Sequence, residues 1–398
     1  MSKKIMILGA SILQLPAIEK AKEMGLEVIV VDMNPEAIGF NVPNVTKEII
    51  STVDISAIVE AAKKYQIDGI MTLATDMPMR SVATVAEEMG LIGIDVDTAY
   101  KATNKAAMRE ALRAGKVPIP EFYRAKNEEE YMEVVKHFTV PFIVKPVDSS
   151  GSRGIFEVID ITNRKLIKEA YEYCRPFSRV GEVIVEEYMI GSEVSVETLS
   201  VDGVCHIIQI TDKLTTGAPH YVEMGHSQPT RHDKKMVEKI AEVTIAANKA
   251  IGITNGPSHT EIIVTSEGPK VVEIGARLGG DNITTYLVPL STGVNMVESC
   301  IKIALGEKPD IKKKWDKGSA IRYFKQHKGV VKSIEGVKEA EKMAGIQQVC
   351  IVHGVGEEVA EVTSSGERMG FVIAQAEDAE AAIRNCYAAL RKISVNIE

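Results

Sequence analysis

The sequence predicts an α/β unit followed by parts in which helices and strands mix differently. In the first hundred residues, apolar segments such as 5–9 (IMILG) and 26–32 (LEVIVVD) alternate with helical patterns. Strands that are apolar throughout are typical of a parallel sheet, because crossover helices cover both of its faces. From about residue 180 onward, alternating polar and apolar positions and a tight-turn signal predict antiparallel strands. Short strands and one last helix then follow a basic, proline-containing junction at 307–318.

Composition and charge limit the class of protein. The chain has 398 residues, so we expect two to four domains at about 100–200 residues each. Hydrophobic residues make up 45%, enough for each domain to bury a core, which excludes disorder along the whole chain. With 47 Lys and Arg against 55 Asp and Glu, the formal net charge is -8. That argues against a general binder of nucleic acid or anionic membranes but leaves room for a local basic pocket.

Neither a membrane span nor a secretory signal is expected. No apolar stretch approaches the length that a span requires, and the first residues run straight into a strand pattern. The cysteines are odd in number and scattered, so they are expected to be reduced, structural thiols of a cytoplasmic protein rather than a zinc site. They are Cys174, Cys205, Cys300, Cys350 and Cys386.

The first unit is predicted at residues 1–98. Gly9 ends the first strand, Gly25 ends the helix that follows, and the second strand ends at Asp32. Helices at 57–65 and 82–90 and a strand at 69–73 continue the alternation. The turn after Gly9 lacks the second and third glycines of the dinucleotide fingerprint G-x-G-x-x-G. We therefore predict an ordinary strand-to-helix turn with Asp32 at a strand end.

The second unit is predicted at residues 99–310. A helix begins near Asn104, and the segment 141–158 is a strand, a small polar loop and another strand. The Val-Asp-Gly-Val step at 201–204 predicts a tight hairpin. A long helix at 233–252 precedes strands at 259–265 and 270–276, and a further helix is predicted at 294–306.

Two lysines and a glycine-containing loop suit phosphate binding. Lys145 ends a buried strand, and the loop 149–154 (SSGSRG) follows it; glycines there let backbone N–H groups approach an anion. The alternative is a simple turn. Lys105 falls in the first turn of a helix, where the macrodipole disfavours a cation by a few tenths to about 1 kcal/mol and a bound anion would reverse that effect. The alternative is a solvated surface lysine.

The segment 186–193 (EEYMIGSE) follows another buried strand and has acids at both ends. Backbone groups at Glu187 and Met189 are suited to an adenine edge, and the Glu193 carboxylate to ribose hydroxyls. The alternative is an edge loop with solvated acids.

Glu261 and Glu273 form the candidate metal pair. If the two strands pair antiparallel with Val264 opposite Lys270, Glu261 lies opposite Glu273 on one face. Facing like charges are destabilising, and a divalent ion such as Mg²⁺ would remove the conflict. Gly275 and Arg277 continue that face. A register one residue different would place the acids on opposite faces.

The segment 214–232 has no clear periodicity and supplies candidate substrate residues. Arg231 is suited to a carboxylate, and His226 to orienting a substrate or accepting a proton. Glu223 lies in the same segment. His259 shares the strand face of Glu261 and is expected to line the pocket. For each of these the alternative is a solvated, capping or core side chain.

Together these motifs resemble the ATP-grasp superfamily of carboxylate–amine ligases, from the first strand to about residue 310. The resemblance implies a Rossmann-like (pre-ATP-grasp) domain at 1–98 and an ATP-grasp domain at 99–310 with a lid at about 120–190. The short strands and final helix that follow predict a small α+β module at 311–398. It implies ATP and Mg²⁺, small-molecule carboxylate and amine substrates, and a homodimer. The residues matched to nucleotide binding are Lys105, Lys145, Ser150, Gly151, Ser152, Gly154, Glu186, Glu187, Met189 and Glu193; those matched to Mg²⁺ are Glu261 and Glu273; those matched to catalysis are Lys145 and Arg277.

One departure stands out. Many members have Glu-x-Asn-x-Arg at the last motif, whereas this chain has Gly275 in the Asn position. The resemblance then implies that a second Mg²⁺ lacks its usual third ligand and uses water or another side chain.

Within the superfamily the chain is most similar to L-amino-acid ligases, on the segments 256–262 (GPSHTEI), 273–283 (EIGARLGGDNI) and 364–378 (SSGERMGFVIAQAED). The implied reaction joins a carboxylate to an amine through an acyl-phosphate. The alternative within the superfamily is a purine-biosynthesis enzyme, like phosphoribosylglycinamide synthetase or aminoimidazole ribotide carboxylase, or a biotin-carboxylase-like enzyme. Outside it, a nicotinamide-dependent oxidoreductase and an ATP-binding regulatory module without turnover remain as hypotheses.

Overall fold

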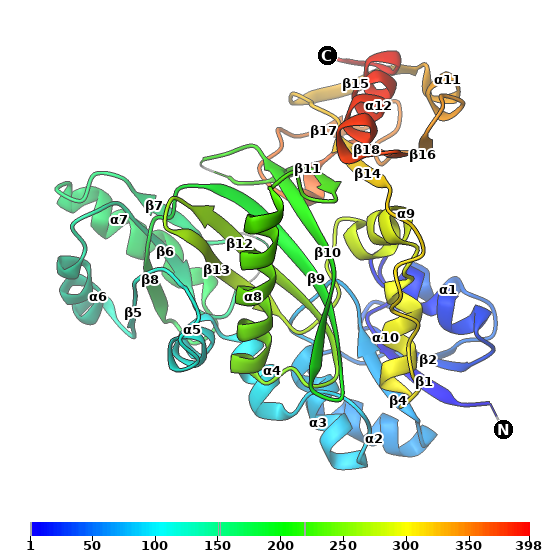
Figure 1. Ribbon diagram of the computed structural model, residues 1–398, viewed down its shortest axis with the longest axis horizontal. Coiled ribbons are helices and arrows are strands. Elements are labelled where there is room, and N and C mark those ends of the chain that lie inside the picture. The colour runs from blue at the N-terminus through cyan, green and yellow to red at the C-terminus, as the bar shows by residue number, and fades with distance from the viewer. Residues whose placement is uncertain (1, 150, 152, 219) are drawn as a thin grey trace.

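The computed structural model describes residues 2–149, 151, 153–218 and 220–398. Its strands form four sheets in this part of the chain. Figure 1 shows the first sheet, the large central sheet, a separate small sheet at one side, and the C-terminal elements packed beside the central sheet.

The first sheet is parallel, as the sequence predicts, with strand order β3-β2-β1-β4. Its strands are β1 (Lys4–Leu8), β2 (Glu27–Val31), β3 (Thr46–Glu48) and β4 (Gly69–Thr72), and its helices are α1 (Leu15–Glu23), η1 (Ile38–Asn41), α2 (Ile55–Tyr65) and α3 (Met79–Met89). Asp32 accepts hydrogen bonds from the backbone N–H of Ala10 (2.8 Å) and of Asn34 (2.9 Å). It therefore closes an ordinary strand-to-helix turn, as predicted.

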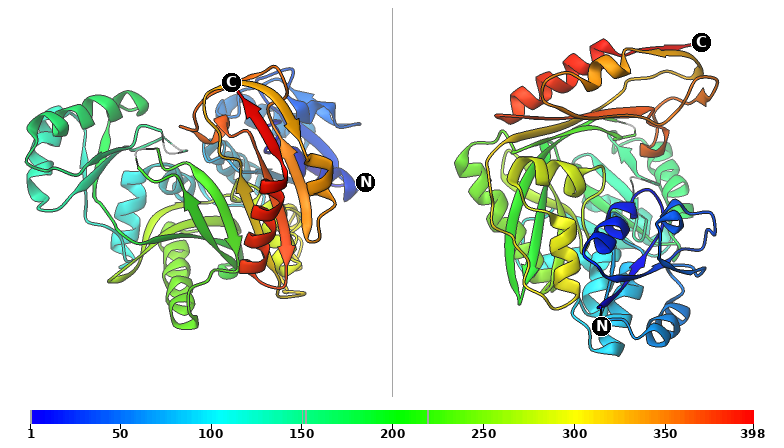
Figure 2. Two further views of the ribbon diagram at one scale, coloured as in Figure 1. Left: turned by 90° about the horizontal axis from the view of Figure 1, so that it is seen from above. Right: turned by 90° about the vertical axis from the view of Figure 1, so that its right-hand side faces the viewer.

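A small antiparallel sheet, here called the lid sheet, has strand order β5-β8-β6-β7. Its strands are β5 (Phe122–Ala125), β6 (Phe142–Pro146), β7 (Phe156–Val158) and β8 (Val183–Glu187). Helices α4 (Val96–Thr103) and α5 (Lys105–Ala114) precede it, and α6 (Glu128–Val134), η2 (Val135–His137), α7 (Arg164–Cys174) and η3 (Arg175–Phe177) lie within its sequence. Tyr131, Phe142 and Val185 belong to its own buried core. Figure 2 (left) shows these elements projecting away from the end that carries α12.

The central sheet has eight strands in the order β13-β12-β9-β10-β11-β14-β18-β16. They are β9 (Ser192–Val201), β10 (Val204–Thr215), β11 (Glu223–Gln228), β12 (Gly256–Thr265), β13 (Gly268–Gly275), β14 (Gly318–Tyr323), β16 (Ile346–Ile351) and β18 (Gly370–Ala376). The predicted tight hairpin joins β9 to β10, with positive φ at Asp202 (50°) and Gly203 (81°), as a two-residue turn of this kind requires. Helix α8 (Lys234–Ile251) packs on β13, β12 and β10.

The C-terminal part contributes three strands to the central sheet, which the sequence pattern did not indicate. The predicted short strands and last helix are present, the helix being α12 (Ala379–Lys392). However, β14 pairs with β11 and extends the sheet through β18 and β16. Gly225 allows this contact, because a Cβ there would come within 2.8 Å of the Arg322 side chain. The remaining elements are η4 (Ile283–Leu287), α9 (Val288–Thr292), α10 (Met296–Ala304), β15 (Gly329–Glu335), α11 (Val337–Glu341), β17 (Glu358–Val359), η5 (Ser365–Glu367) and β19 (Ser394–Ile397).

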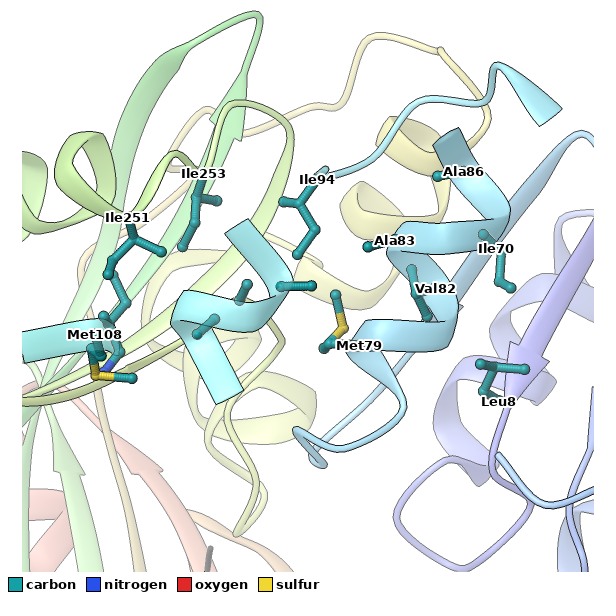
Figure 3. Packing of buried hydrophobic residues seen from close by; sticks show 14 of the residues in the cluster. Leu8, Ile70, Met79, Val82, Ala83, Ala86, Ile94, Met108, Ile251 and Ile253 are labelled. Atoms are coloured by element: carbon teal, nitrogen blue, oxygen red, sulfur yellow. The ribbon is translucent and has the colours of Figure 1, made fainter. Parts of the chain in front are cut away.

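One buried core joins the first sheet to the central sheet. It contains Leu8, Ile70 and Val82 from the first sheet and α3, together with Met108 on α5 and Ile251 at the end of α8 (Figure 3). Helix α10, although it follows the central strands in sequence, packs on α1 and β4. The two units are therefore joined by packing, and loops at the ends of β1 and β4 are brought to the edge of the central sheet.

All five cysteines are free, in agreement with the predicted reduced thiols. Burial raises the pKa of the Cys300 and Cys386 thiols to about 12. Among the residues described by the structure, no helix is both long and apolar enough to span a bilayer.

Candidate active site

A cleft of about 740 Å³ lies between the lid sheet and the central sheet. Its walls come from α5, β6, β8, β12 and β13, from the loop after β4, and from Ser365 in the C-terminal part. Of the residues singled out from the sequence, the lining includes Lys105, Lys145, Gly151, Glu186, Glu187, Met189, Glu193, Glu223, His226, His259, Glu261, Glu273 and Arg277. Ser150 and Ser152 lie outside the described residues.

Side-chain alternation in the central sheet explains why charged groups meet in this cleft. Ile262 and Ile274 belong to the core on which α8 packs, so their neighbours Glu261 and Glu273 point to the other face. That opposite face of β12 and β13 is a wall of the cleft.

Lys145 belongs to a buried charge network. Its Nζ lies 2.9 Å from Glu186 Oε2, and Arg109 Nε lies 2.6 Å from Glu186 Oε1. Burial alone would raise the pKa of the Glu186 carboxyl, but Arg109 and Lys145 lower it to about 2. The Glu186 side chain therefore holds the two cations in place and is 1% exposed.

Arg109 was missed by the sequence reasoning. The available signal was its position on α5, one turn after Lys105 and on the same helix face. Its NH2 also donates to the carbonyl of Val272 at 2.7 Å. Arg109 thus ties α5 to β8 and β13.

Lys105 is not a solvated surface lysine. It is the first residue of α5, after the N-cap Asn104, and its side chain is 13% exposed. Its Nζ donates to the carbonyl of Ser149 at 2.8 Å and lies 2.9 Å from Glu273 Oε1. The unfavourable position of this cation in the helix dipole is thus compensated by an acid and a carbonyl, and Lys105 links Ser149 to Glu273 on β13.

The two described glycines of that loop differ. Both have positive φ, 67° at Gly151 and 76° at Gly154, which favours glycine. A Cβ at Gly151 would meet nothing within 4 Å, whereas one at Gly154 would lie 2.6 Å from Phe177. Gly151 leaves its backbone open to the cleft. Gly154 is explained by packing and is not among the described residues that line the cleft, so we do not retain it as a nucleotide contact.

Glu261 does face Glu273, but the register used to predict this was wrong at the hairpin end. Lys270 pairs with Ile263, not with Val264. A β-bulge follows, because Ile262 pairs with Val271 while Glu261 pairs with Glu273, which leaves Val272 as the extra residue. Because the bulge shifts the pairing by one residue, Glu261 and Glu273 lie opposite each other on the same face of the sheet.

Lysines relieve the like-charge conflict between these acids. Glu273 pairs with Lys105, and Lys213 Nζ lies 3.0 Å from Glu261 Oε1, 2.5 Å from Glu193 Oε1 and 3.7 Å from Glu223 Oε1. Burial alone would lower the pKa of Lys213, but these three acids raise it well above its usual value. Lys213 was also missed; its only signal was a lone lysine within an alternating strand pattern.

The acid pair is compatible with magnesium bound together with a phosphate ligand. The described residues contain no group of three or more His, Cys, Asp or Glu side chains arranged to hold a metal. Glu261 and Glu273 do place two carboxylates on one face, and their side chains are 26% and 29% exposed. Mg²⁺ is commonly held by one or two carboxylates, with phosphate oxygens and water completing its octahedron.

His259 presents a positive charge beside Glu261. Its Nδ1 lies 2.6 Å from Glu197 Oε1, and its Nε2 lies 3.5 Å from Glu261 Oε1. Burial alone would lower the pKa of His259, but the buried Glu197 and the nearby Glu261 raise it to about 9. The imidazolium is therefore held in the wall of the cleft at neutral pH.

The C-terminal part closes one end of the cleft. Arg368 donates from NH1 and NH2 to both oxygens of Asp281, each at 2.7 Å, and His226 Nε2 lies 3.2 Å from Asp281 Oδ2. Burial alone would raise the pKa of Asp281, but Arg368 and His226 lower it. Ser365 Oγ donates to Glu223 Oε2 at 3.2 Å. The sequence reasoning did not identify Asp281, Arg368 or Ser365 as site residues.

Arg231 is not at the cleft, contrary to the sequence-based expectation. Its Nε lies 2.9 Å from Asp212 Oδ2 and its NH1 2.9 Å from Glu380 Oε1. These two acids hold the side chain at the surface, 54% exposed, and Arg231 is absent from the described residues that line the cleft. We therefore withdraw it as a substrate ligand.

Three family models match the chain in sequence order. An ATP-grasp N-terminal domain matches residues 18–92, an ATP-grasp domain matches 138–285, and L-amino acid ligase C-terminal domain 2 matches 322–398. The chain therefore contains an ATP-grasp domain at residues 138–285, preceded by an ATP-grasp N-terminal domain at residues 18–92.

Two named ligases are similar to this chain over most of its length. It is 24% identical over 318 residues to the L-arginine-specific L-amino acid ligase of Bacillus subtilis, which covers 79% of this chain and 76% of that protein. It is 25% identical over 368 residues to phosphoribosylamine–glycine ligase of Caldanaerobacter subterraneus subsp. tengcongensis, covering 87% and 86%. In fold it is similar to the crystal structure of L-amino acid ligase from Bacillus licheniformis, with a TM-score of 0.86, 22% identity and coverage of 100% and 99%.

Most residues that line the cleft belong to the segment that matches the ATP-grasp domain. Lys145, Glu193, Glu261, Glu273 and Arg277 fall within residues 138–285. Ser365 and Arg368 instead fall within the match to L-amino acid ligase C-terminal domain 2. The end of the cleft at Asp281 is thus built partly by the C-terminal match.

Proposed function

We propose that this protein joins the carboxylate of one L-amino acid to the amine of a second, using ATP and releasing ADP and phosphate. The observation that carries the proposal is a single cleft lined by Lys105, Lys145 and the facing acids Glu261 and Glu273, in which Lys105 Nζ lies 2.9 Å from Glu273 Oε1. The L-amino acid ligase relatives and the C-terminal match support the amino-acid substrates.

The nucleotide would lie between the lid sheet and the central sheet. Backbone groups at Glu187 and Met189 would bind the adenine edge, and Glu193 the ribose hydroxyls. Lys105, Lys145 and the amide groups at Gly151 would bind the phosphates. The buried Glu186 is proposed to position Lys145 rather than to contact the base, since both of its oxygens are taken by cations.

Mg²⁺ would be held by Glu261 and Glu273 and would neutralise charge on the phosphates when bound. The lysines now paired with these acids would then turn toward phosphate oxygens. Each lysine keeps a second partner: Lys105 the Ser149 carbonyl, and Lys213 the Glu193 carboxylate.

The first chemical step would transfer a phosphoryl group to the substrate carboxylate. A carboxylate oxygen attacks the γ-phosphorus of ATP, the bond to the β-phosphate oxygen breaks, and ADP and an acyl-phosphate form. Arg277 and the imidazolium of His259 present N–H donors to the oxygens on which charge develops. Donors held in place before the reaction stabilise such charge most effectively.

The second step would form the amide. The amine substrate, in its neutral form, attacks the acyl carbon, phosphate leaves with the electrons of the broken C–O bond, and the proton lost by the amine nitrogen passes to the released phosphate. The glycine-containing loop 149–154 would cover the phosphates and exclude water, which otherwise hydrolyses the acyl-phosphate.

We assign substrate binding to the end of the cleft that holds Glu223, His226 and His259. Glu223 is a carboxylate in the lining, 24% exposed, and its charge suits a substrate ammonium group. His226 is 1% exposed and is oriented by Asp281.

A purine-biosynthesis reaction is the second candidate. The match to phosphoribosylamine–glycine ligase over 86% of that protein favours it. The C-terminal match to an L-amino acid ligase domain favours the dipeptide reaction.

A screen of ADP and phosphate release separates these candidates. Single and paired L-amino acids would be tested beside phosphoribosylamine with glycine, aminoimidazole ribotide and bicarbonate. Release that requires a pair of amino acids, with a dipeptide detected by mass spectrometry, supports the proposal. Release only with a purine intermediate would overturn it, and ATP binding without turnover on any pair would favour a regulatory module.

We further propose a homodimer in the cytoplasm. The family resemblance implies the homodimer, and the five free thiols support the cytoplasmic location. Light scattering after size exclusion tests the homodimer, since one chain has a mass of 43.4 kDa.

A further inference from the structure

An ion pair joins the first unit to the centre of the cleft. Asp76 lies in the loop between β4 and α3, and Arg277 follows β13, 201 positions later in the chain. Asp76 Oδ1 lies 2.8 Å from Arg277 Nε, and Asp76 Oδ2 lies 3.2 Å from Arg277 NH2. The side chains are 13% and 16% exposed, and both residues line the cleft.

The pair holds one edge of the guanidinium and leaves another edge available. Of its five N–H donors, Nε–H and one on NH2 point to Asp76, and one on NH1 points to the carbonyl of Leu278 at 3.3 Å. Among the described residues no further partner is present, so one N–H on NH1 and one on NH2 remain. These two form the planar fork that binds an oxyanion through two parallel hydrogen bonds.

Gly275 makes room for this arrangement. A Cβ at position 275 would lie 2.8 Å from Asp76 Oδ1 and 3.3 Å from Arg277 Nε. The backbone of Gly275 has no positive φ, so an alanine could adopt it without strain. A side chain at position 275 would therefore collide with the Asp76 carboxylate, and this contact explains why glycine stands there.

We propose that Asp76 is a positioning residue for the ligase reaction: it fixes the Arg277 guanidinium so that its remaining fork faces the acyl-phosphate oxygens. The first unit thereby completes the catalytic centre. Both oxygens of Asp76 are committed to Arg277, so Asp76 acts through the arginine and not as a ligand of the metal. This role for Asp76 rests on the proposed function.

The first test is a double-mutant cycle measured without turnover. Gly275→Ala, Asp76→Ala and the double variant are compared by urea unfolding. In the wild-type background the added Cβ must displace the Asp76 carboxylate and lower the unfolding midpoint. In the Asp76→Ala background the same Cβ enters vacated space, and the midpoint is expected not to fall further. Equal falls in both backgrounds would contradict the contact.

The second test measures the role in turnover. Asp76→Asn keeps the shape and one acceptor but turns an N–H group toward the Arg277 donor. We expect kcat to fall about 100-fold, the scale seen when a catalytic group is misplaced, with KM for ATP unchanged. Asp76→Glu, which keeps the charge, should recover part of kcat at the same KM. Gly275→Ala should lower kcat in the wild-type background and have no further effect on kcat in Asp76→Ala.

The outcomes separate this proposal from the function itself. Normal kcat in Asp76→Asn would overturn the positioning role. A raised Mg²⁺ requirement with normal kcat at saturating Mg²⁺ would also overturn it, because it would make Asp76 a metal ligand. If the wild-type protein releases no ADP with any amino-acid pair, the proposed dipeptide function fails, while the unfolding cycle still decides whether Asp76 and Gly275 interact as described.

Discussion

Glu186→Gln should destabilise the protein at neutral pH by about 3 kcal/mol. The pKa of Glu186 is lowered from 4.5 to about 2, and each unit of pKa difference between folded and unfolded protein corresponds to about 1.4 kcal/mol. Removal of the carboxylate also leaves Lys145 and Arg109 buried without a counter-charge, which typically costs about 3–5 kcal/mol. Both routes lead to the same order of magnitude.

The stabilisation that Glu186 contributes is expected to depend on pH. Because the folded-state pKa is lowered, the stabilisation is complete above about pH 4.5 and is lost as the pH falls toward 2. By pH 3 the difference in unfolding free energy between wild type and Glu186→Gln should shrink to about half.

Urea unfolding followed by circular dichroism at pH 7 and pH 3 measures this difference. Glu133→Gln is the matched control, because Glu133 pairs with Lys136 at the surface, where both side chains are more than 60% exposed. Exposed pairs contribute little, so its midpoint should match wild type at both pH values. A Glu186→Gln protein as stable as wild type at pH 7, or a difference that stays constant down to pH 3, would refute the assignment of a charged, ion-paired Glu186.

Three further variants probe the cleft. Glu273→Gln should lower turnover by at least about 100-fold while the melting temperature stays near wild type, since Lys105 keeps its bond to a carbonyl; near-normal ADP release would rule out a metal role. Lys213→Met should lower both turnover and the free energy of unfolding, because it leaves Glu193 and Glu261 without their partner. The free energy of unfolding is expected to fall by about 3–5 kcal/mol, and an unchanged urea midpoint would contradict this. Gly154→Ala should destabilise the lid sheet by about 1–3 kcal/mol through the clash with Phe177 and the positive φ, seen as faster proteolysis of that sheet; wild-type cleavage rates would argue against it.

Local signals in the sequence predicted much of the fold. The parallel first sheet followed from apolar strands alternating with helices, and the β9–β10 hairpin from the Asp202-Gly203 turn. The continuation of the central sheet into β14, β18 and β16 could not be predicted. It depends on pairing between β11 and β14, which are separated by about ninety residues, and no local pattern specifies such pairing.

The candidate site, like the fold, was predicted only in part from the sequence. Glu261 and Glu273 were placed face to face, but by a register that the bulge at Val272 corrects. A bulge changes which residues share a face without leaving a clear mark in the sequence. Arg231 was chosen for its chemistry alone, and the structure shows that Asp212 and Glu380 already bind it.

Partners that come from distant segments were missed for a related reason. Arg109 and Lys213 are recognisable only once the strands and helices around them are assembled. Gly275 was interpreted only as a missing metal ligand, and its contact with Asp76, a residue of the first unit, could not be predicted from the sequence.

If ATP phosphorylates a substrate carboxylate in this cleft, one carboxylate oxygen must pass to the released phosphate, and oxygen-isotope labelling detects that transfer. An L-amino acid labelled with ¹⁸O in its carboxylate would be incubated with the protein, ATP, Mg²⁺ and an amine partner, and the released phosphate analysed by mass spectrometry. An acyl-phosphate predicts one ¹⁸O atom in the phosphate, together with ADP. Unlabelled phosphate, or label recovered in AMP with release of pyrophosphate, would contradict it.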